Sequence, residues 1–121
     1  MNKRIMIVDD SATMRQTVGL TLREAGYEVL EANDGVDALL SLEQERIDML
    51  ITDLNMPRLD GVGLIANVRR KDGQRFLPIV MLTTESDEGL KTSAKRAGAS
   101  AWLTKPFRPD QLLGLVRTVL A

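Results

Sequence analysis

The sequence contains no cysteine and no histidine. Without cysteine, a disulfide framework and a zinc–thiolate site are both excluded. Without histidine, the commonest general base and the commonest metal ligand are missing, so a Ser-His-Asp triad is excluded as well. Any chemistry in this chain therefore uses carboxylates, lysine, hydroxyl groups and the backbone.

Excess positive charge, aromatic side chains and long apolar runs are also scarce. The formal net charge is -1 and aromatic residues make up 3% of the chain, which leaves little to attract phosphates or to stack on bases. No stretch approaches the roughly 20 apolar residues that span a bilayer, and the first apolar run is too short for a signal peptide. We expect a cytoplasmic protein with no nucleic-acid partner and no membrane insertion.

What the sequence does contain is an alternation of short apolar runs with segments of helical periodicity. Its 121 residues, 44% of them hydrophobic, fit one folded domain over residues 1–121. Strands are expected at Ile5–Val8, Val29–Leu30, Met49–Thr52, Ile79–Leu82 and Ala101–Leu103. Continuously apolar strands that alternate with helices are typical of a parallel sheet covered on both faces. The pattern therefore predicts an α/β fold of five βα units.

Polar residues, glycine and proline mark the ends of the expected helices. The predicted N-caps of the second, third and fourth helices are Asp34, Asp60 and Ser86, and Pro109 lies in the first turn of the fifth. Gly26 and Gly98 end the first and fourth helices. The first helix is expected to turn Met14, Val18, Leu22 and Ala25 inward, and the last one Leu112, Leu113, Val116 and Leu120.

Polar side chains follow four of the expected strands at their carboxyl ends. Asp9 and Asp10 follow the first strand, Asp53 the third, Thr83 the fourth and Lys105 the fifth. Because the carboxyl ends of parallel strands meet at one edge, where ligands bind in such sheets, we expect these side chains to lie together.

This grouping has a chemical consequence. Two carboxylates about 4 Å apart repel by roughly 4 kcal/mol at an effective dielectric constant of 20, so a protonated acid, Lys105 or a divalent cation has to compensate. An all-oxygen site suits Mg²⁺. Thr83 and Lys105 suit a phosphoryl group, and Asp53 is our candidate for a carboxylate that attacks phosphorus without a general base.

Four motifs carry a family resemblance. The stretches IVDDSATMR, ITDLNMPRLDG, MLTTE and LTKPF, in this order, resemble the receiver domain of two-component response regulators over the entire chain. The stretches DGVDAL, NMP and KPF are most similar to those of single-domain chemotaxis regulators. The resemblance implies a flavodoxin-like (βα)5 doubly wound parallel sheet with strand order 2-1-3-4-5, and a receiver domain with no output domain.

The resemblance also implies roles for single residues. Asp53 would accept a phosphoryl group from a histidine of a separate sensor histidine kinase. Asp10, Asp53 and the backbone carbonyl of Asn55 would ligate Mg²⁺, and Asp9 would act through water bound to the metal. The protein would be a phosphoacceptor with self-catalysed, Mg²⁺-dependent phosphotransfer and dephosphorylation, not a turnover enzyme.

Further implied roles surround the phosphoryl group. Thr83 and Lys105 would contact its oxygens, and the Thr84 amide would add a donor. The Lys105–Pro106 peptide would be cis. Asn55 and Glu85 would tune attack by water, and this pair of residues suggests a short-lived phosphoryl group.

A switch would follow phosphorylation. Thr83 would move toward the phosphoryl group, and the loop after the fourth strand would move with it. Trp102 would then change its packing. The face made by the fourth helix, the fifth strand and the fifth helix would then change its affinity for a partner. Trp102 departs from the family pattern, which usually has Tyr or Phe there. Two interpretations stay open, a smaller packing change or a ring that stays outward as a partner contact.

Several functions remain open at this stage. A monomer that binds a flagellar-motor switch, a phosphate sink for a shared kinase, and a receiver cut from a longer regulator all fit the residues. A haloacid-dehalogenase-like phosphatase would need a second acid where the chain has Asn55. A flavodoxin-like flavin protein is disfavoured because the acidic edge would repel the flavin phosphate.

Overall fold

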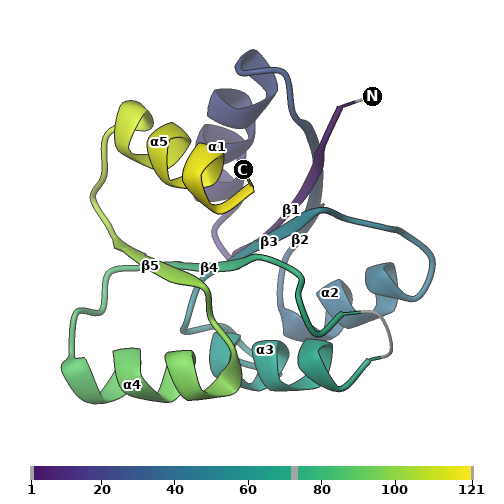
Figure 1. Ribbon diagram of the computed structural model, residues 1–121, viewed down its shortest axis with the longest axis vertical. Coiled ribbons are helices and arrows are strands. Elements are labelled where there is room, and N and C mark those ends of the chain that lie inside the picture. The colour runs from purple at the N-terminus through teal and green to yellow at the C-terminus, as the bar shows by residue number, and fades with distance from the viewer. Residues whose placement is uncertain (1, 72–73, 121) are drawn as a thin grey trace.

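The computed structural model describes residues 2–71 and 74–120, so the expected domain limits at residues 1 and 121 lie outside the described part. At its centre is a parallel five-stranded sheet in the order β2-β1-β3-β4-β5 (Figure 1). The strands are β1 (Arg4–Val8), β2 (Glu28–Ala32), β3 (Met49–Thr52), β4 (Ile79–Thr83) and β5 (Ala101–Thr104). This order confirms the fold class expected from the resemblance.

The helices form one layer on each face of the sheet. They are α1 (Ala12–Glu24), α2 (Gly35–Leu42), α3 (Gly61–Arg70), α4 (Glu88–Ala97) and α5 (Pro109–Leu120). Figure 1 shows α1 and α5 together on one face, and α2, α3 and α4 on the other. None of the helices in the described ranges combines the length and hydropathy that crossing a membrane requires.

The two layers explain why the strands are apolar at every position. In β1, Met6 and Val8 pack in the cluster under α2, α3 and α4, whereas Ile5 and Ile7 pack in the cluster under α1 and α5. Successive side chains of a strand point to opposite faces, so a strand covered on both faces needs apolar residues throughout. The edge strand β2 is partly open to solvent and accordingly includes the exposed Glu28 and Glu31.

The strands extend beyond the apolar runs that predicted them. Strand β2 begins at Glu28 and ends at Ala32 instead of covering only Val29 and Leu30, and β4 and β5 each include the threonine that follows the apolar run. Backbone pairing, which does not depend on side-chain polarity, determines where a strand ends.

Most of the predicted helix caps are confirmed. The carboxylates of Asp34 and Asp60 accept the amide hydrogens of Asp37 and Gly63 at the starts of α2 and α3. Gly98 follows α4 with a φ of 121°, a conformation that favours glycine.

Two of the predictions about helix ends are wrong. The N-cap of α4 is Asp87 and not Ser86, because the Asp87 carboxylate accepts the amide hydrogen of Leu90 at 3.1 Å. An acidic cap is also favoured by the helix dipole. Ala25 is exposed, because it lies just after the last residue of α1 and its side chain does not reach the core.

Candidate functional site

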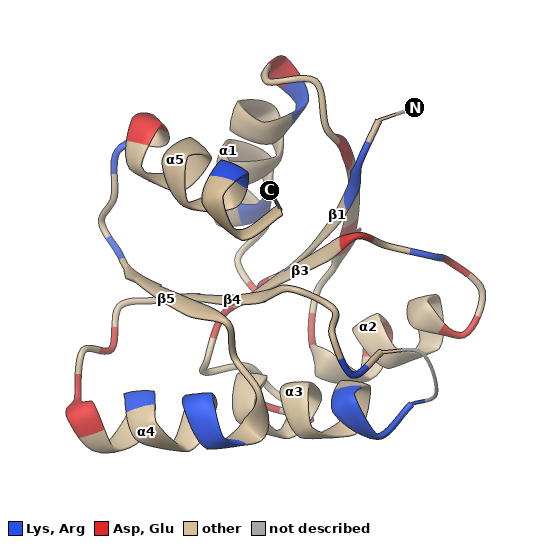
Figure 2. Ribbon diagram, viewed as in Figure 1, with Lys and Arg blue, Asp and Glu red and all other residues tan. Residues whose placement is uncertain are grey.

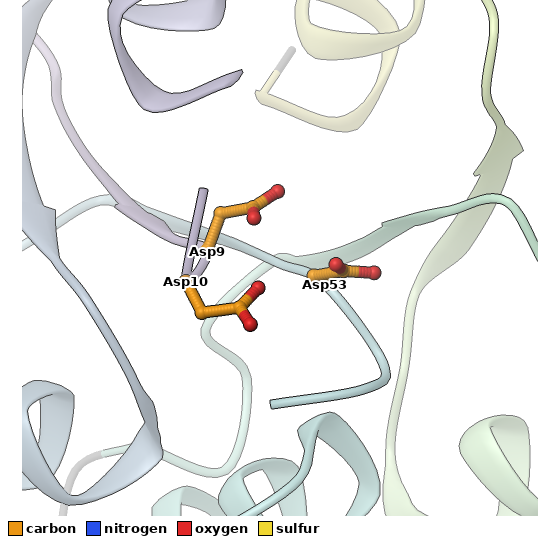
Figure 3. A group of neighbouring side chains, drawn as sticks. All are labelled: Asp9, Asp10 and Asp53. Carbon is orange, nitrogen blue, oxygen red and sulfur yellow. The ribbon is translucent and has the colours of Figure 1, made fainter. Parts of the chain in front are cut away.

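Three carboxylates meet where the central strands β1 and β3 end. Val8 of β1 pairs with Thr52 of β3, so the residues that follow each strand are neighbours. Asp9, Asp10 and Asp53 each offer an oxygen within 4.8 Å of the others, and Figure 3 shows their side chains gathered beside the two strand ends. The predicted gathering of acids is therefore present at the point where the strand order reverses.

The three acids differ in their surroundings. Asp9 is buried, with 3% of its surface exposed, whereas Asp10 is exposed and Asp53 is intermediate. Backbone hydrogen bonds continue past the strand ends, from the Asp53 amide to the Val8 carbonyl at 2.9 Å and from the Asp9 amide to the Ala32 carbonyl at 3.2 Å. Asp9 and Asp53 thus lie on backbone held by the sheet.

Lys105 lies between two of these carboxylates. Its Nζ is 2.9 Å from Asp9 Oδ2 and 3.6 Å from Asp53 Oδ2. Its backbone amide donates to the Thr83 carbonyl at 2.8 Å, which attaches the residue to the end of β4. The Lys105–Pro106 peptide is cis, as the resemblance implied.

The electrostatics of the cluster are unbalanced. Burial raises the pKa of Asp53, and the negative charge of Asp9 raises it further. The positive charge of Lys105, the Leu54 amide that donates to Asp53 Oδ1 at 2.7 Å, and the Thr83 hydroxyl lower that pKa in part. Three carboxylates opposed by one ammonium group leave two negative charges, which one divalent cation would balance. The all-oxygen donor set fits Mg²⁺.

Thr83 is a buried hydroxyl at the end of β4, with 1% of its surface exposed. Its Oγ1 accepts a hydrogen bond from the Glu85 amide at 3.3 Å. The Glu85 carboxylate accepts the Asn55 side-chain amide at 3.4 Å, while Asn55 itself is exposed. Thr84, the residue that follows Thr83, is exposed as well. The two residues that were expected to tune water attack are thus in contact with each other.

Trp102 of β5 contacts the same loop. Its indole N–H donates to the Glu85 carbonyl at 3.2 Å, and its partly buried ring packs against the core cluster under α4. Lys91 Nζ lies 5.9 Å from the centre of the ring, a cation–π arrangement. A series of hydrogen bonds therefore runs from the Thr83 hydroxyl to the backbone N–H of Glu85, and from the backbone carbonyl of Glu85 to the Trp102 indole.

Two arginines near the site were not found from the sequence. Arg15 Nη1 donates to the Asp9 carbonyl, and its Nε is 3.4 Å from Glu31 Oε1. Its position four residues after the cap Ser11, on the first turn of α1, is a signal that would have found it. Arg58, in the loop between β3 and α3, pairs with Asp34, a residue 24 positions away, and no local pattern indicates that contact.

Comparison with protein families and curated proteins agrees with this geometry. The family described as the response regulator receiver domain matches residues 5–117. Chemotaxis protein CheY1 of Helicobacter pylori is 40% identical over 119 residues, which cover 97% of this chain and 96% of that protein. The transcriptional regulatory protein PhoP of Bacillus subtilis is 34% identical over 120 residues, and this chain spans only 49% of its length.

Solved structures show the same fold. Chemotaxis protein CheY4 of Vibrio cholerae superposes with a TM-score of 0.95 at 42% identity, over 98% of this chain and 99% of that one. The receiver domain of a Pseudomonas aeruginosa sensor histidine kinase, which has a magnesium ion coordinated in its active site cleft, superposes with a TM-score of 0.91 at 28% identity, over 99% of this chain and 98% of that one. The chain therefore belongs to the response regulator receiver domain family of two-component signalling, with chemotaxis proteins of the CheY type among its relatives.

Proposed function

We propose that this receiver domain accepts a phosphoryl group on Asp53 from the phosphohistidine of a sensor histidine kinase. The observation that carries the proposal is the cluster of Asp9, Asp10 and Asp53, with Lys105 Nζ 2.9 Å from Asp9 and 3.6 Å from Asp53. The donor histidine lies outside this sequence, which contains none.

In this proposal Asp10, Asp53 and the carbonyl oxygen of Asn55 would hold Mg²⁺, and Asp9 would act through water bound to the metal. The ion supplies neutralisation of the charge on the phosphoryl oxygens. The two negative charges left over in the cluster support a divalent ion at this place.

The transfer itself uses the chain's own groups. Asp53 Oδ1 accepts a hydrogen bond from the Leu54 amide, which leaves Oδ2 as the attacking oxygen. A bond forms from Oδ2 to phosphorus, and the phosphorus–nitrogen bond of the donor breaks with its electron pair staying on the imidazole. The Lys105 ammonium and the Thr83 hydroxyl then contact phosphoryl oxygens, with the Thr84 amide as a further donor. No general base is needed, because the attacking carboxylate carries no proton to remove.

Phosphorylation would act as a switch through the series from Thr83 to Trp102. When the Thr83 hydroxyl turns to a phosphoryl oxygen, the Glu85 amide loses its acceptor and the loop after β4 changes shape. Trp102 changes its packing with this loop, because its indole N–H donates a hydrogen bond to the Glu85 carbonyl. Moving a two-state equilibrium from 1:99 to 99:1 takes about 5.5 kcal/mol, which the new contacts of Thr83 and Lys105 have to supply.

The output surface of this switch would be the α4-β5-α5 face. A half-open pocket of about 250 Å³ lies there, between α4 and β5, and it is lined by Lys91, Ala94, Lys95, Ala99, Ser100, Ala101 and Trp102. Figure 2 shows Lys and Arg along α4. We favour a cytoplasmic monomer in a chemotaxis pathway, since chemotaxis proteins are among the relatives that this chain matches over nearly their full length. A role as a phosphate sink for a shared kinase is the alternative.

Hydrolysis of the phosphoryl group would be catalysed by the domain itself. Asn55 and Glu85 are hydrogen-bonded to each other at this edge of the sheet, and in this proposal the pair tunes the attack of water on the phosphoryl group. Hydrolysis returns the Asp53 carboxylate and releases inorganic phosphate, and we expect the phosphoryl group on Asp53 to be short-lived.

The test is phosphorylation by a small phosphodonor, acetyl phosphate, with and without Mg²⁺. We expect the intact mass to gain one phosphoryl group only with Mg²⁺, and the fluorescence of Trp102 to change in step with it. The control is Asp53→Asn, which keeps the shape of the side chain but lacks the nucleophile. If the parent chain gains no phosphoryl group, or the variant gains it equally, the proposal is wrong.

A further inference from the structure

Arg58 is, in the described part of the chain, the one residue other than glycine with a positive φ, 69°. This left-handed region strains a residue that has a Cβ atom and favours glycine or asparagine. Strained residues of this kind persist where surrounding contacts hold them, and they gather at functional sites. Arg58 lies in the loop between β3 and α3, five residues after Asp53 and three after Asn55.

Arg58 is held mainly by a bidentate ion pair with Asp34, and its Nη2 also lies 3.5 Å from Asp37 Oδ1. Arg58 Nε is 2.8 Å from Asp34 Oδ2, and Nη2 is 3.0 Å from Oδ1. Asp34 is 6% exposed, and its Oδ1 also accepts the Asp37 amide at the start of α2. Two parallel hydrogen bonds fix the orientation of the guanidinium as well as its distance. The β3–α3 loop is thereby attached to the first turn of α2.

A second close approach reinforces this junction. A Cβ atom on Gly35, the first residue of α2, would lie 2.7 Å from the carbonyl oxygen of Leu59, so the helix begins directly against the loop. At the base of the loop, the Gly61 amide donates to the Leu54 carbonyl at 2.8 Å. The peptide of Asn55 lies between the closed base of the loop and its attachment at Arg58.

Resting on the proposed function, we infer that Arg58 is a positioning residue for the metal site. Its ion pair with Asp34 holds the β3–α3 loop in the shape that offers the Asn55 carbonyl as a ligand for Mg²⁺. Mg²⁺ demands a nearly ideal octahedral arrangement, so a loop that samples several shapes binds it more weakly than one that is already ordered. The strain at Arg58 persists because the ion pair compensates for it.

The sign of the effect separates this inference from simple electrostatics. Arg58 is a positive charge near a cation site, and its removal leaves the Asp34 carboxylate without its partner. Charge alone would therefore tighten Mg²⁺ binding when Arg58 is removed. Loss of loop order would weaken it.

The test is calorimetric titration of the unphosphorylated chain with Mg²⁺, using Arg58→Gly and Arg58→Asn. Both replacements tolerate a positive φ, so they remove the ion pair without adding strain. We expect the Mg²⁺ dissociation constant to rise about tenfold, as for other residues that orient a metal ligand. In phosphorylation by acetyl phosphate, we expect the Mg²⁺ concentration at half-maximal rate to rise equally while the rate at saturating Mg²⁺ is unchanged.

Two further variants complete the design. Asp34→Asn keeps an N-cap for α2 but removes the negative charge that pairs with Arg58. The double variant Asp34→Asn, Arg58→Gly should bind Mg²⁺ no more weakly than whichever single variant binds it more weakly, because both substitutions remove the same ion pair. Arg108→Gly removes an exposed arginine of the loop between β5 and α5, which pairs with Asp110 of α5. This variant is the matched control and should leave the dissociation constant unchanged.

The outcomes are distinct. Mg²⁺ binding by Arg58→Gly and Arg58→Asn that equals or exceeds that of the parent chain would overturn the inference and leave the proposed function standing. Weaker binding with no change in the Mg²⁺ dependence of phosphorylation would also overturn it. A parent chain that binds no Mg²⁺ at millimolar concentration would overturn the metal site of the proposed function, and the inference with it. Urea unfolding in EDTA checks that each variant is folded.

Discussion

Asp34 serves two elements at once. Its carboxylate caps α2 through the Asp37 amide and holds the Arg58 guanidinium of another loop. The Arg58 hydrogen bonds and the Asp37 amide lower the pKa of Asp34, and these effects outweigh its burial, which raises it. A single buried carboxylate thus connects the edge of the site to the second helix.

This lowered pKa predicts a pH dependence of stability. The unfolded chain binds a proton at Asp34 near the ordinary value of 3.8, and the folded chain binds it only at lower pH. The stabilisation by the Asp34 carboxylate is therefore fully present well above pH 3.8 and is lost as the pH falls through the folded pKa. In urea unfolding, the parent chain should have a higher free energy of unfolding than Asp34→Asn at neutral pH, and this difference should become smaller as the pH is lowered. A difference that stays constant down to pH 3 would contradict this.

At the scale of elements, the site depends on how closely α3 approaches the end of β3. A Cβ atom on Gly61, the first residue of α3, would lie 2.3 Å from the Asp53 carbonyl oxygen and 3.0 Å from Leu54 Cα. Both are backbone atoms that cannot turn aside. The first residue of α3 therefore has to be glycine, because the backbone of Asp53 and Leu54 leaves no room for a Cβ atom there.

We expect Gly61→Ala to lower the free energy of unfolding by about 2–3 kcal/mol, as overpacking of a well-filled site does. The displaced Asp53 backbone should also slow phosphorylation by acetyl phosphate. Gly114→Ala in α5 is the matched control, because a Cβ atom there meets nothing within 4 Å. Alanine suits a helix interior better than glycine, so this variant should gain about 0.5–1 kcal/mol. Equal effects of the two substitutions in urea unfolding would refute the packing argument.

At the scale of the whole molecule, the fold brings together three carboxylates that repel one another. Receiver domains, the family to which this chain belongs, are phosphoacceptors and not classical enzymes. The buried Asp9 has a partner in Lys105, whereas the exposed Asp10 has none among the ion pairs of the described residues. The metal-free protein therefore carries uncompensated repulsion at the carboxyl edge of its sheet.

We expect Mg²⁺ to raise the stability of the whole domain, by about 2.7 kcal/mol at a concentration 100 times the dissociation constant. Asp10→Asn should abolish most of this gain. In EDTA the same variant should be more stable than the parent chain by about 0.5 kcal/mol, because the repulsion is relieved at an exposed position. Thermal unfolding with and without Mg²⁺ measures both effects.

Asp110→Asn is the control for that experiment, since it removes an exposed acid of α5 that pairs with Arg108. The stability that Mg²⁺ adds to this variant should equal the stability that it adds to the parent chain. A parent chain whose unfolding temperature does not respond to Mg²⁺, or an Asp10→Asn variant that responds fully, would show that Asp10 is not a ligand.

The sequence by itself determined the order of the elements and which residues gather at one edge of the sheet. Apolar runs, caps such as Asp60 and the polar residues at strand ends act locally, and parallel topology brings those ends together. The tertiary structure alone decided that Lys105 lies between Asp9 and Asp53, that Trp102 bonds the loop after β4, and that Arg58 pairs with Asp34. These contacts join side chains from separate loops, and their geometry depends on how helices and sheet pack, which no local spacing encodes.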